Sequence, residues 1–307
     1  MQTILGSGGA IGIELAKSLK EYTNKIRLVS RSPKAVNDTD ELFTCDLLNK
    51  EKVLEAVKGS EIAYLTVGLP YKTKVWKEQW PVVMQNVIDA CKVHQCKLVF
   101  FDNIYMLDPS QMSNITEETT INPSSEKGKV RAQIAQMVMD ATESEDLKAL
   151  IARSADFYGP NINNSVLNET VYKNLKAGKK ANWLCSLNYK HSFTYTPDAA
   201  KATALLGNTE SAYNKVWNLP TDKNSFTGRE WIDAFAKEMG VKPKSMVVNN
   251  FMVKVMGFFN PIMKEIVEML YQYDRDYFFN SNKFDNAFDF NKTSYADGIK
   301  NIISGGQ

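Results

Sequence analysis

Histidine and cysteine are scarce in this 307-residue sequence, which contains two histidines and four cysteines. His94 and His191 are far apart in the chain, and the cysteines follow none of the spacings typical of metal sites. We therefore expect no metal centre. So few cysteines without a regular spacing are typical of reduced thiols, not of a disulfide framework.

The sequence also has little excess charge and no long apolar run. Its net charge is +2, which indicates no strong field toward nucleic acid or membranes. No apolar run approaches the roughly 20 residues that a membrane-spanning helix needs. Because the first predicted strand starts at Met1, we expect no leader peptide and a cytoplasmic location. The expected partner is a small-molecule substrate, with neither nucleic acid nor membrane.

A glycine-rich segment follows the first apolar run, Met1–Leu5, and precedes a run that favours a helix. Its glycines follow the pattern G-x-x-G-x-x-G at positions 6, 9 and 12. A strand, a tight turn and a helix in this order predict a site where the helix N-terminus receives a phosphate. In this interpretation Gly6 permits the turn, Gly9 lets the backbone approach a pyrophosphate, and Gly12 lets the helix pack closely. The cofactor-binding candidates in this segment are Gly6, Gly8, Gly9, Ala10, Ile11 and Gly12.

Strand-like and helix-like runs alternate through the first half of the chain. This alternation predicts an α/β fold with a doubly wound parallel sheet of the Rossmann type and a smaller C-terminal substrate lobe. The predicted strands are 1–5, 25–30, 61–67, 97–101, 149–153, 191–195 and 216–219. The predicted helices include 52–57, 80–93 and 129–141. We expect a dinucleotide-binding domain over 1–160 with returning segments at about 191–219, and the smaller lobe over 161–190 and 220–307.

The end of the second predicted strand indicates which dinucleotide is bound. NAD sites usually place an acidic residue there to bind the ribose 2′-hydroxyl, whereas this sequence reads Val29-Ser-Arg-Ser-Pro33. Arg31 can pair with a 2′-phosphate and Ser30 can donate to it, so NADP(H) is favoured over NAD(H). Arg31 is alternatively a solvated loop charge. Further cofactor candidates are Asp46 and Leu47, in a loop that can reach the adenine amino group, and Val67 and Gly68, at the end of the strand predicted over 61–67.

The chain resembles the extended short-chain dehydrogenase/reductases of the NAD-dependent epimerase/dehydratase type. The resemblance rests on the glycine pattern, on Cys45-Asp-Leu47, and on Arg153 followed by Tyr158-Gly-Pro160. It also includes the segment 191–198, which ends in a helix-capping Asp198. The resemblance implies an oxidoreductase that moves a hydride between the cofactor and a small carbonyl or sugar-type substrate, a class that includes nucleotide sugars. It also makes a homodimer plausible.

The sequence departs from this family at the catalytic pair. The family uses a Tyr and, four residues later, a Lys, but the best-matching segment has Lys127 and Arg131 at these positions. The chain is similar to an atypical subgroup that shares this altered site. The catalytic candidates are Lys127, Arg131, Tyr105 and Asp102, with Lys127 also a cofactor-binding candidate.

Three interpretations of these residues stay open. In the first, catalysis is rebuilt: Arg131 lowers the pKa of Lys127, Tyr105 or Tyr158 can supply a phenol, and Asp102 or Asn103 orients the substrate. In the second, the two cations bind ribose, phosphate or an anionic substrate without moving a proton. In the third, Lys127 is an ordinary solvated lysine. The alternative function is a catalytically idle regulatory protein that senses the dinucleotide.

Aromatic residues and methionine are concentrated in the last third of the chain, for example at Phe251, Phe258 and Phe259. Two interpretations apply to this content. Core packing is the simpler one, and a flexible apolar wall of a substrate pocket is the other.

Overall fold

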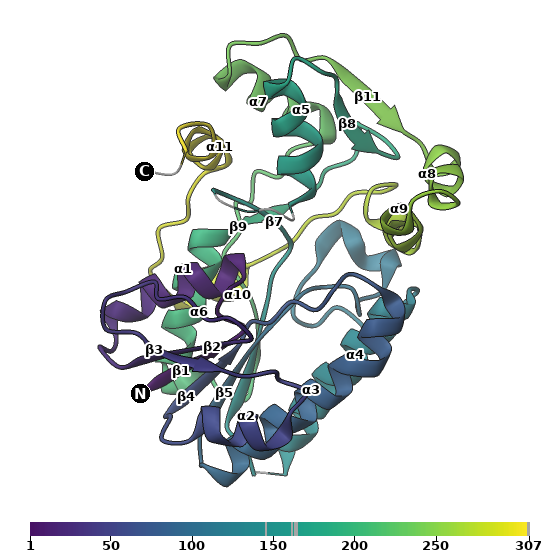
Figure 1. The fold of residues 1–307 in the computed structure, drawn as a ribbon. Helices are drawn as coiled ribbons and strands as arrows, with labels where there is room; N and C mark the ends of the chain where they lie inside the picture. Colours follow the sequence, from purple (N-terminus) through teal and green to yellow (C-terminus); the bar gives the residue numbers. More distant parts are fainter. Residues whose placement is uncertain (145, 161, 163–164, 306–307) are drawn as a thin grey trace. The chain divides into compact units, whose positions relative to one another are not determined.

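The computed structural model describes residues 1–144, 146–160, 162 and 165–305, and it confirms the predicted fold class. Seven parallel strands form one sheet in the order β10-β6-β5-β4-β1-β2-β3 (Figure 1). The order reverses next to β1, which is typical of a doubly wound sheet with ligands at the carboxyl ends of its strands. The strands are β1 (Gln2–Leu5), β2 (Ile26–Ser30), β3 (Glu41–Thr44), β4 (Ile62–Leu65), β5 (Lys97–Asp102), β6 (Ala149–Arg153) and β10 (Val216–Asn218).

Helices cover both faces of this sheet. In Figure 1, α1 and α6 lie on one face, and α2, α3 and α4 lie on the other. Strands β1, β4 and β6 are buried along their whole length, as expected for parallel strands covered on both sides. The helices are α1 (Ala10–Ser18), α2 (Lys50–Val57), α3 (Thr73–Val93), α4 (Glu126–Glu143) and α6 (Thr196–Gly207).

The chain forms two compact units. Unit 1 comprises residues 1–106, 127–154 and 199–219, and unit 2 comprises 107–126, 155–198 and 220–307. The domain boundaries given from the sequence stay a prediction, and residues 161, 163 and 164 at the start of the predicted smaller lobe lie outside the described residues.

Unit 2 contains two small parallel sheets around an aromatic core. Strand β7 (Asp156–Tyr158) pairs with β9 (Phe193–Tyr195), and β8 (Ala181–Leu184) pairs with β11 (Ser245–Val248). In the core, Trp231 lies 4.4 Å from Tyr295 between ring centroids. The helices of unit 2 are α5 (Lys173–Lys176), α7 (Gly228–Glu238), α8 (Asn250–Gly257), α9 (Pro261–Ile266), α10 (Asn282–Ala287) and α11 (Tyr295–Ile303), with short 3-10 segments at Pro109–Asn114 and Val267–Gln272.

The aromatic and methionine residues of the last third do not share one role. Met269, Tyr273 and Tyr277 are buried, as core packing requires, whereas Phe258 and Phe259 are almost fully exposed. Core packing is therefore wrong for Phe258 and Phe259, in the turn that follows α8.

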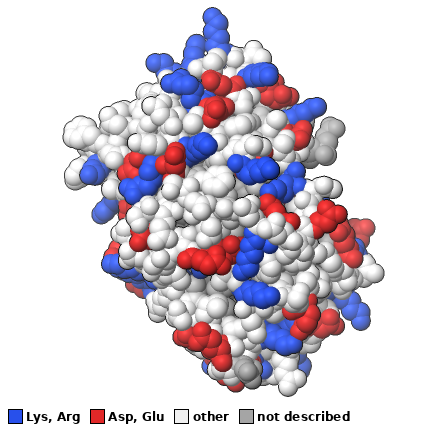
Figure 2. All heavy atoms as spheres, turned by 180° about the vertical axis from the view of Figure 1, so that it is seen from behind, with Lys and Arg blue, Asp and Glu red and all other residues white. Residues whose placement is uncertain are grey.

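Charged residues of both signs are intermixed on the face shown in Figure 2. This face carries no extended patch of one sign, in keeping with the small net charge. Across the described residues, no helix combines the length and the apolar character needed to cross a membrane.

Candidate functional site

The glycine turn between β1 and α1 is sterically constrained at two of its glycines. Gly6 has a φ of +103°, and a Cβ there would lie 2.4 Å from the backbone of Val67. A Cβ on Gly12 would lie 2.8 Å from the Gly6 carbonyl oxygen. Gly6 therefore permits the turn to pass close to the end of β4, and Gly12 lets the helix pack against the turn.

The two glycines between them are open to solvent instead. A Cβ on Gly8 would meet nothing within 4 Å, and one on Gly9 would meet only the Gly6 carbonyl oxygen, at 3.8 Å. Gly9 is the N-cap of α1, and no side chain caps this helix. The first N–H groups of a helix have no intrahelical acceptor. The exposed backbone at Gly8 and Gly9 thus leads directly to donors, at Ala10 and Ile11, that an anion can reach.

Ser7 is a residue of this turn that the sequence interpretation missed. Its side chain is buried, and within the described residues its Oγ has no hydrogen-bond partner. A buried hydroxyl normally has such a partner. The open glycines, the uncapped helix and this hydroxyl together fit a pyrophosphate group; the only sequence signal for Ser7 was its place between the glycines.

The end of β2 lies beside the glycine turn. The carbonyl oxygen of Val29 accepts from the backbone N–H groups of Gly6, at 2.9 Å, and Ser7, at 3.1 Å. Ser30 follows and is half-buried, with its Oγ accepting from the Ser32 N–H. Arg31 is exposed, and in the described part of the chain it makes no hydrogen bond or ion pair. Its guanidinium is therefore available to a ligand.

Asp46 and Leu47 form the loop after β3. The Asp46 carboxylate is exposed and accepts from the Leu48 N–H at 3.0 Å. Leu47 is buried, and its carbonyl oxygen accepts from the Asn86 side chain of α3. The backbone N–H of Cys45 donates to the carbonyl of Ser30, so this loop is attached to the end of β2, the edge where the glycine turn also lies.

Val67 and Gly68 follow the end of β4. The backbone N–H of Thr66 donates to the carbonyl of Leu5, which fixes this segment beside the end of β1. Val67 is half-buried and Gly68 is exposed, with open space around it. The structure therefore brings the predicted cofactor residues of β1, β2 and β4 to one edge of the sheet.

Arg131 forms a buried ion pair with Asp102 at the end of β5. Its Nε donates to Asp102 Oδ1 at 2.7 Å, and its Nη2 donates to the same oxygen. The two side chains are only 4% and 0% exposed. The guanidinium also lies over the rings of Trp80, at 4.6 Å, and Phe100, at 5.0 Å. The charge of Arg131 is thus neutralised inside an aromatic cage, so Arg131 does not present a bare positive charge to Lys127.

Lys127 is fully buried one turn earlier on α4. Its Nζ donates to Thr73 Oγ1 at 3.1 Å and lies 4.6 Å above the ring of Tyr71. The prediction of an ordinary solvated lysine is therefore wrong, because Lys127 has no exposed surface. Tyr71 and Thr73 precede and begin α3, and the polar sequence before Trp76 gave little signal of their role.

The two cations and Tyr105 share one aromatic cluster. Tyr71 contacts Trp76 edge to face at 5.7 Å, and Trp76 stacks on Tyr105 at 6.1 Å with an interplanar angle of 14°. Tyr105 is half-buried, and its N–H donates to the side chain of Asn103. The structure therefore groups Lys127, Arg131, Asp102 and Tyr105, four residues predicted from separate segments.

Tyr158, the other phenol considered, belongs to the core of unit 2. Its side chain is fully buried, and burial raises its pKa well above the ordinary value. Its ring contacts Tyr195, Trp231 and Tyr295. Tyr158 therefore packs the core of unit 2, and its raised pKa disfavours its phenolate form.

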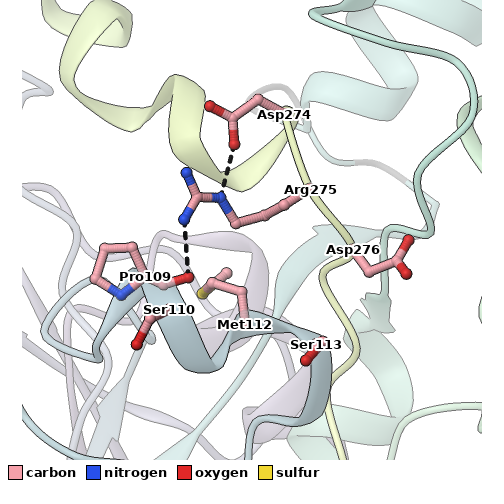
Figure 3. Close-up of a pocket in the computed structure, with 7 residues that line it drawn as sticks. All are labelled: Pro109, Ser110, Met112, Ser113, Asp274, Arg275 and Asp276. Atoms are coloured by element: carbon pink, nitrogen blue, oxygen red, sulfur yellow. Dashed lines mark hydrogen bonds and ion pairs between the residues drawn. The ribbon is translucent and has the colours of Figure 1, made fainter.

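A separate cavity of about 380 Å³ lies in unit 2 (Figure 3). Figure 3 shows the Arg275 guanidinium between Asp274 and Pro109; it donates to the Asp274 carboxylate at 2.7 Å and to the Pro109 carbonyl at 3.1 Å. The predicted site residues of the glycine turn and of α4 belong to unit 1, so they do not line this cavity. Its lining residues are Pro109, Ser110, Met112, Ser113, Asp274, Arg275 and Asp276.

The sheet order and the glycine turn define a Rossmann-type protein of the doubly wound class. No group of metal-binding side chains occurs among the residues that the structure describes. The model of the NAD dependent epimerase/dehydratase family matches residues 3–219. The chain belongs to this family.

Solved structures support the same fold at low sequence identity. UDP-glucose 4-epimerase from Thermus thermophilus, in complex with NAD, has a TM-score of 0.78 and 18% identity, with 100% of this chain and 99% of that chain covered. dTDP-glucose 4,6-dehydratase from Bacillus anthracis, also in complex with NAD, has a TM-score of 0.80 and 15% identity, with 99% of this chain and 95% of that chain covered. UDP-N-acetylglucosamine 4-epimerase from Bacillus cereus has a TM-score of 0.76 and 16% identity, with 100% of this chain and 99% of that chain covered. A comparison with curated protein sequences gave no match.

Proposed function

We propose that the chain binds a nicotinamide dinucleotide with its pyrophosphate on the glycine turn. The observation that carries the proposal is the open backbone at Gly8 and Gly9, which leads to an uncapped helix N-terminus beside the unpartnered Ser7 hydroxyl. Backbone N–H groups and the helix dipole both favour a phosphate there. The NAD complexes of two solved relatives of the fold support the choice of ligand.

NADP(H) is the preferred form in this proposal. Arg31 is exposed at the end of β2 and makes no ion pair in the described part of the chain, and the half-buried Ser30 precedes it. A guanidinium pairs well with a 2′-phosphate. The Asp46 carboxylate, by contrast, accepts from the Leu48 N–H in its own loop.

The proposed activity is that of an epimerase/dehydratase-like oxidoreductase on a small carbonyl or sugar-type substrate. When bound, the nicotinamide supplies a donor or acceptor of hydride. The protein must then hold or move a proton at the substrate oxygen. Lys127 is our candidate, because the Thr73 hydroxyl and the Tyr71 ring fix its ammonium group. Tyr105, half-buried in the same cluster, is the candidate phenol.

Arg131 and Asp102 have a positioning role in this scheme. Their ion pair joins α4 to the end of β5, and Asp102 also accepts from the Asn103 N–H at 2.7 Å. The pair thereby sets the positions of Lys127, one turn away, and of the segment that leads to Tyr105. The substrate class extends to nucleotide sugars, on which the solved relatives of the fold act.

Titration of the purified protein with NADPH and NADH tests the cofactor site. We expect Gly9→Val to weaken binding at least about tenfold, because its side chain would occupy the space of the pyrophosphate. Thermal unfolding without ligand is the control, since Gly9 has a φ of −84° that valine adopts without strain. Unchanged binding by Gly9→Val would place the ligand elsewhere.

Turnover of a panel of carbonyl compounds and nucleotide sugars tests the reaction. We expect Lys127→Met to lower kcat about 100-fold or more, with dinucleotide binding nearly unchanged. Lys129→Met is the matched control, because Lys129 is an exposed lysine of the same helix. Equal turnover by wild type and Lys127→Met would exclude Lys127 as the proton carrier.

A second function, an idle regulator that senses the dinucleotide, is favoured by two observations. Lys127 has no exposed surface, and Arg131 is already neutralised by Asp102. The regulator predicts tight dinucleotide binding, no turnover across the panel, and a protein partner whose binding differs between oxidised and reduced dinucleotide. Any turnover above that of Lys127→Met counts against it.

A further inference from the structure

An exposed apolar surface covers α8 and the turn that connects it to α9. Phe251 is 73% exposed, and Phe258 and Phe259 are 86% and 87% exposed. Isolated exposed apolar side chains are common on proteins, but a contiguous group marks an interaction site. We call this group the α8 apolar surface; its members are Phe251, Met252, Val255, Met256, Phe258, Phe259 and Ile262.

The spacing of these residues places them on one side of the helix. With about 100° per residue, the six positions from 251 to 259 fall within an arc of roughly 160°. The opposite side carries Val253, which is buried against Leu270 and its neighbours, and Gly257, whose absent Cβ would lie 3.2 Å from Lys264 Cα in α9. The broad apolar side of α8 thus faces away from the packed side, the reverse of an ordinary amphipathic helix.

Lysines border the α8 apolar surface. Lys254 and Lys264 are exposed on the two helices, which lie side by side (Figure 1). Lys242 and Lys244 are exposed as well, but they precede β11 and are separated from α8 by the length of that strand. Residues 241–266 contain these four lysines and a single acid, the half-buried Glu265. The nearby Glu268 accepts from the Glu126 N–H at 2.7 Å.

We propose that the α8 apolar surface docks this protein on an anionic lipid surface, with the phenylalanines in the acyl boundary and the lysines among the headgroups. Phenylalanine and aliphatic side chains beside lysines are typical of helices that lie in a membrane interface. Protein interfaces also favour Phe and Met, but they are depleted of Lys, and lysines border this surface. A second copy of the chain is disfavoured as well, because residues 241–266 would offer its lysines a single acid, Glu265.

This proposal changes the expectation that membranes are not a partner. That expectation rested on net charge and on the absence of a long apolar run, and both describe the whole chain. The α8 apolar surface is a local feature of about two helical turns. It requires no membrane-spanning helix. Its local excess of lysines is not visible in the net charge of +2, because that value is summed over the whole chain.

Vesicle sedimentation tests the proposal with the full chain. We expect binding to vesicles in which about a third of the lipid is phosphatidylglycerol, and at least about tenfold weaker binding to phosphatidylcholine alone. Phe258→Ser/Phe259→Ser should reduce binding more than about tenfold. Lys254→Gln/Lys264→Gln should reduce it roughly fivefold per lysine, and added salt should reduce wild-type binding.

Matched variants keep the result interpretable. Val93→Ser removes another exposed apolar side chain, 64% exposed at the end of α3, and Lys58→Gln/Lys201→Gln removes two exposed lysines elsewhere; both should bind as wild type does. Circular dichroism should show unchanged unfolding for the phenylalanine variant. Absence of sedimentation with anionic vesicles overturns the proposal, and so does equal binding by Phe258→Ser/Phe259→Ser. A dimer or a protein complex that this variant abolishes, without vesicle binding, also overturns it.

Discussion

Removal of Asp102 should destabilise the protein far more than removal of an acid from a surface ion pair. The Asp102 carboxylate has no exposed surface, and it is the ion-pair partner of Arg131 inside the cage of Trp80 and Phe100. Asp102→Ala would leave a guanidinium buried without a counter-charge. Breaking a buried pair in this way costs about 3–5 kcal/mol of the free energy of unfolding.

Urea denaturation of three variants measures this effect. Asp102→Ala should lose about 3–5 kcal/mol, whereas Asp102→Ala/Arg131→Met should recover most of the loss, because no uncompensated charge remains. Asp89→Ala is the matched control, since Asp89 pairs with the exposed Lys50 and should cost less than about 1 kcal/mol. A loss by Asp102→Ala no greater than that of Asp89→Ala, or no recovery in the double variant, would refute the buried pair.

Three further predictions concern the glycine turn, the cofactor and the response to acid. Gly6→Ala should lower the free energy of unfolding by at least about 2 kcal/mol, because Gly6 has a positive φ and contacts Val67. Gly8→Ala should lower it by less than about 1 kcal/mol, because a Cβ there meets no atom within 4 Å. Equal losses in urea denaturation would contradict the steric argument. Arg31→Ala should weaken NADPH binding about tenfold and NADH binding less than about twofold in titrations; equal effects on both would exclude 2′-phosphate recognition. Hydrogen bonds from Lys148 and Lys97 lower the pKa of Glu210 from 4.5 to about 2. The stabilisation by this carboxylate is thus complete above pH 4.5 and lost as the pH falls toward 2. Glu210→Gln should flatten the acid side of the stability curve by a small amount, and an unchanged curve would show that the pair contributes nothing.

The fold could be predicted because its buried parallel strands are continuous apolar runs. Strands β1, β4 and β6 are of this kind, and their positions follow from the sequence. Strand β3 was missed because it is a mostly exposed edge strand whose residues, Glu41–Thr44, form no apolar run. Helix α3 begins at Thr73, seven residues before the predicted start at Trp80, and it continues through Pro81. Proline usually marks the first turn of a helix; here burial of Trp76 and Trp80 offsets its cost.

The candidate site could be predicted in its parts but not in its contacts. Glycine spacing indicated the turn, and the altered helix pair identified Lys127 and Arg131. The ion pair between Arg131 and Asp102 could not be predicted. The two residues are 29 positions apart in the sequence, and only the packing of α4 beside the end of β5 brings them together. The role of Thr73 depends in the same way on contact with a lysine 54 residues away.

The buried ion pair between Arg131 and Asp102 also restricts how such a site arises and how it can be reversed. A lone buried arginine and a lone buried aspartate are each unfavourable, so neither residue is accepted easily before the other. A neutral residue at either position is therefore tolerated only together with a neutral residue at the other. Introduction of a lysine at position 131 by engineering would keep a cation beside Asp102, but the rings of Trp80 and Phe100 would then enclose a smaller ammonium group.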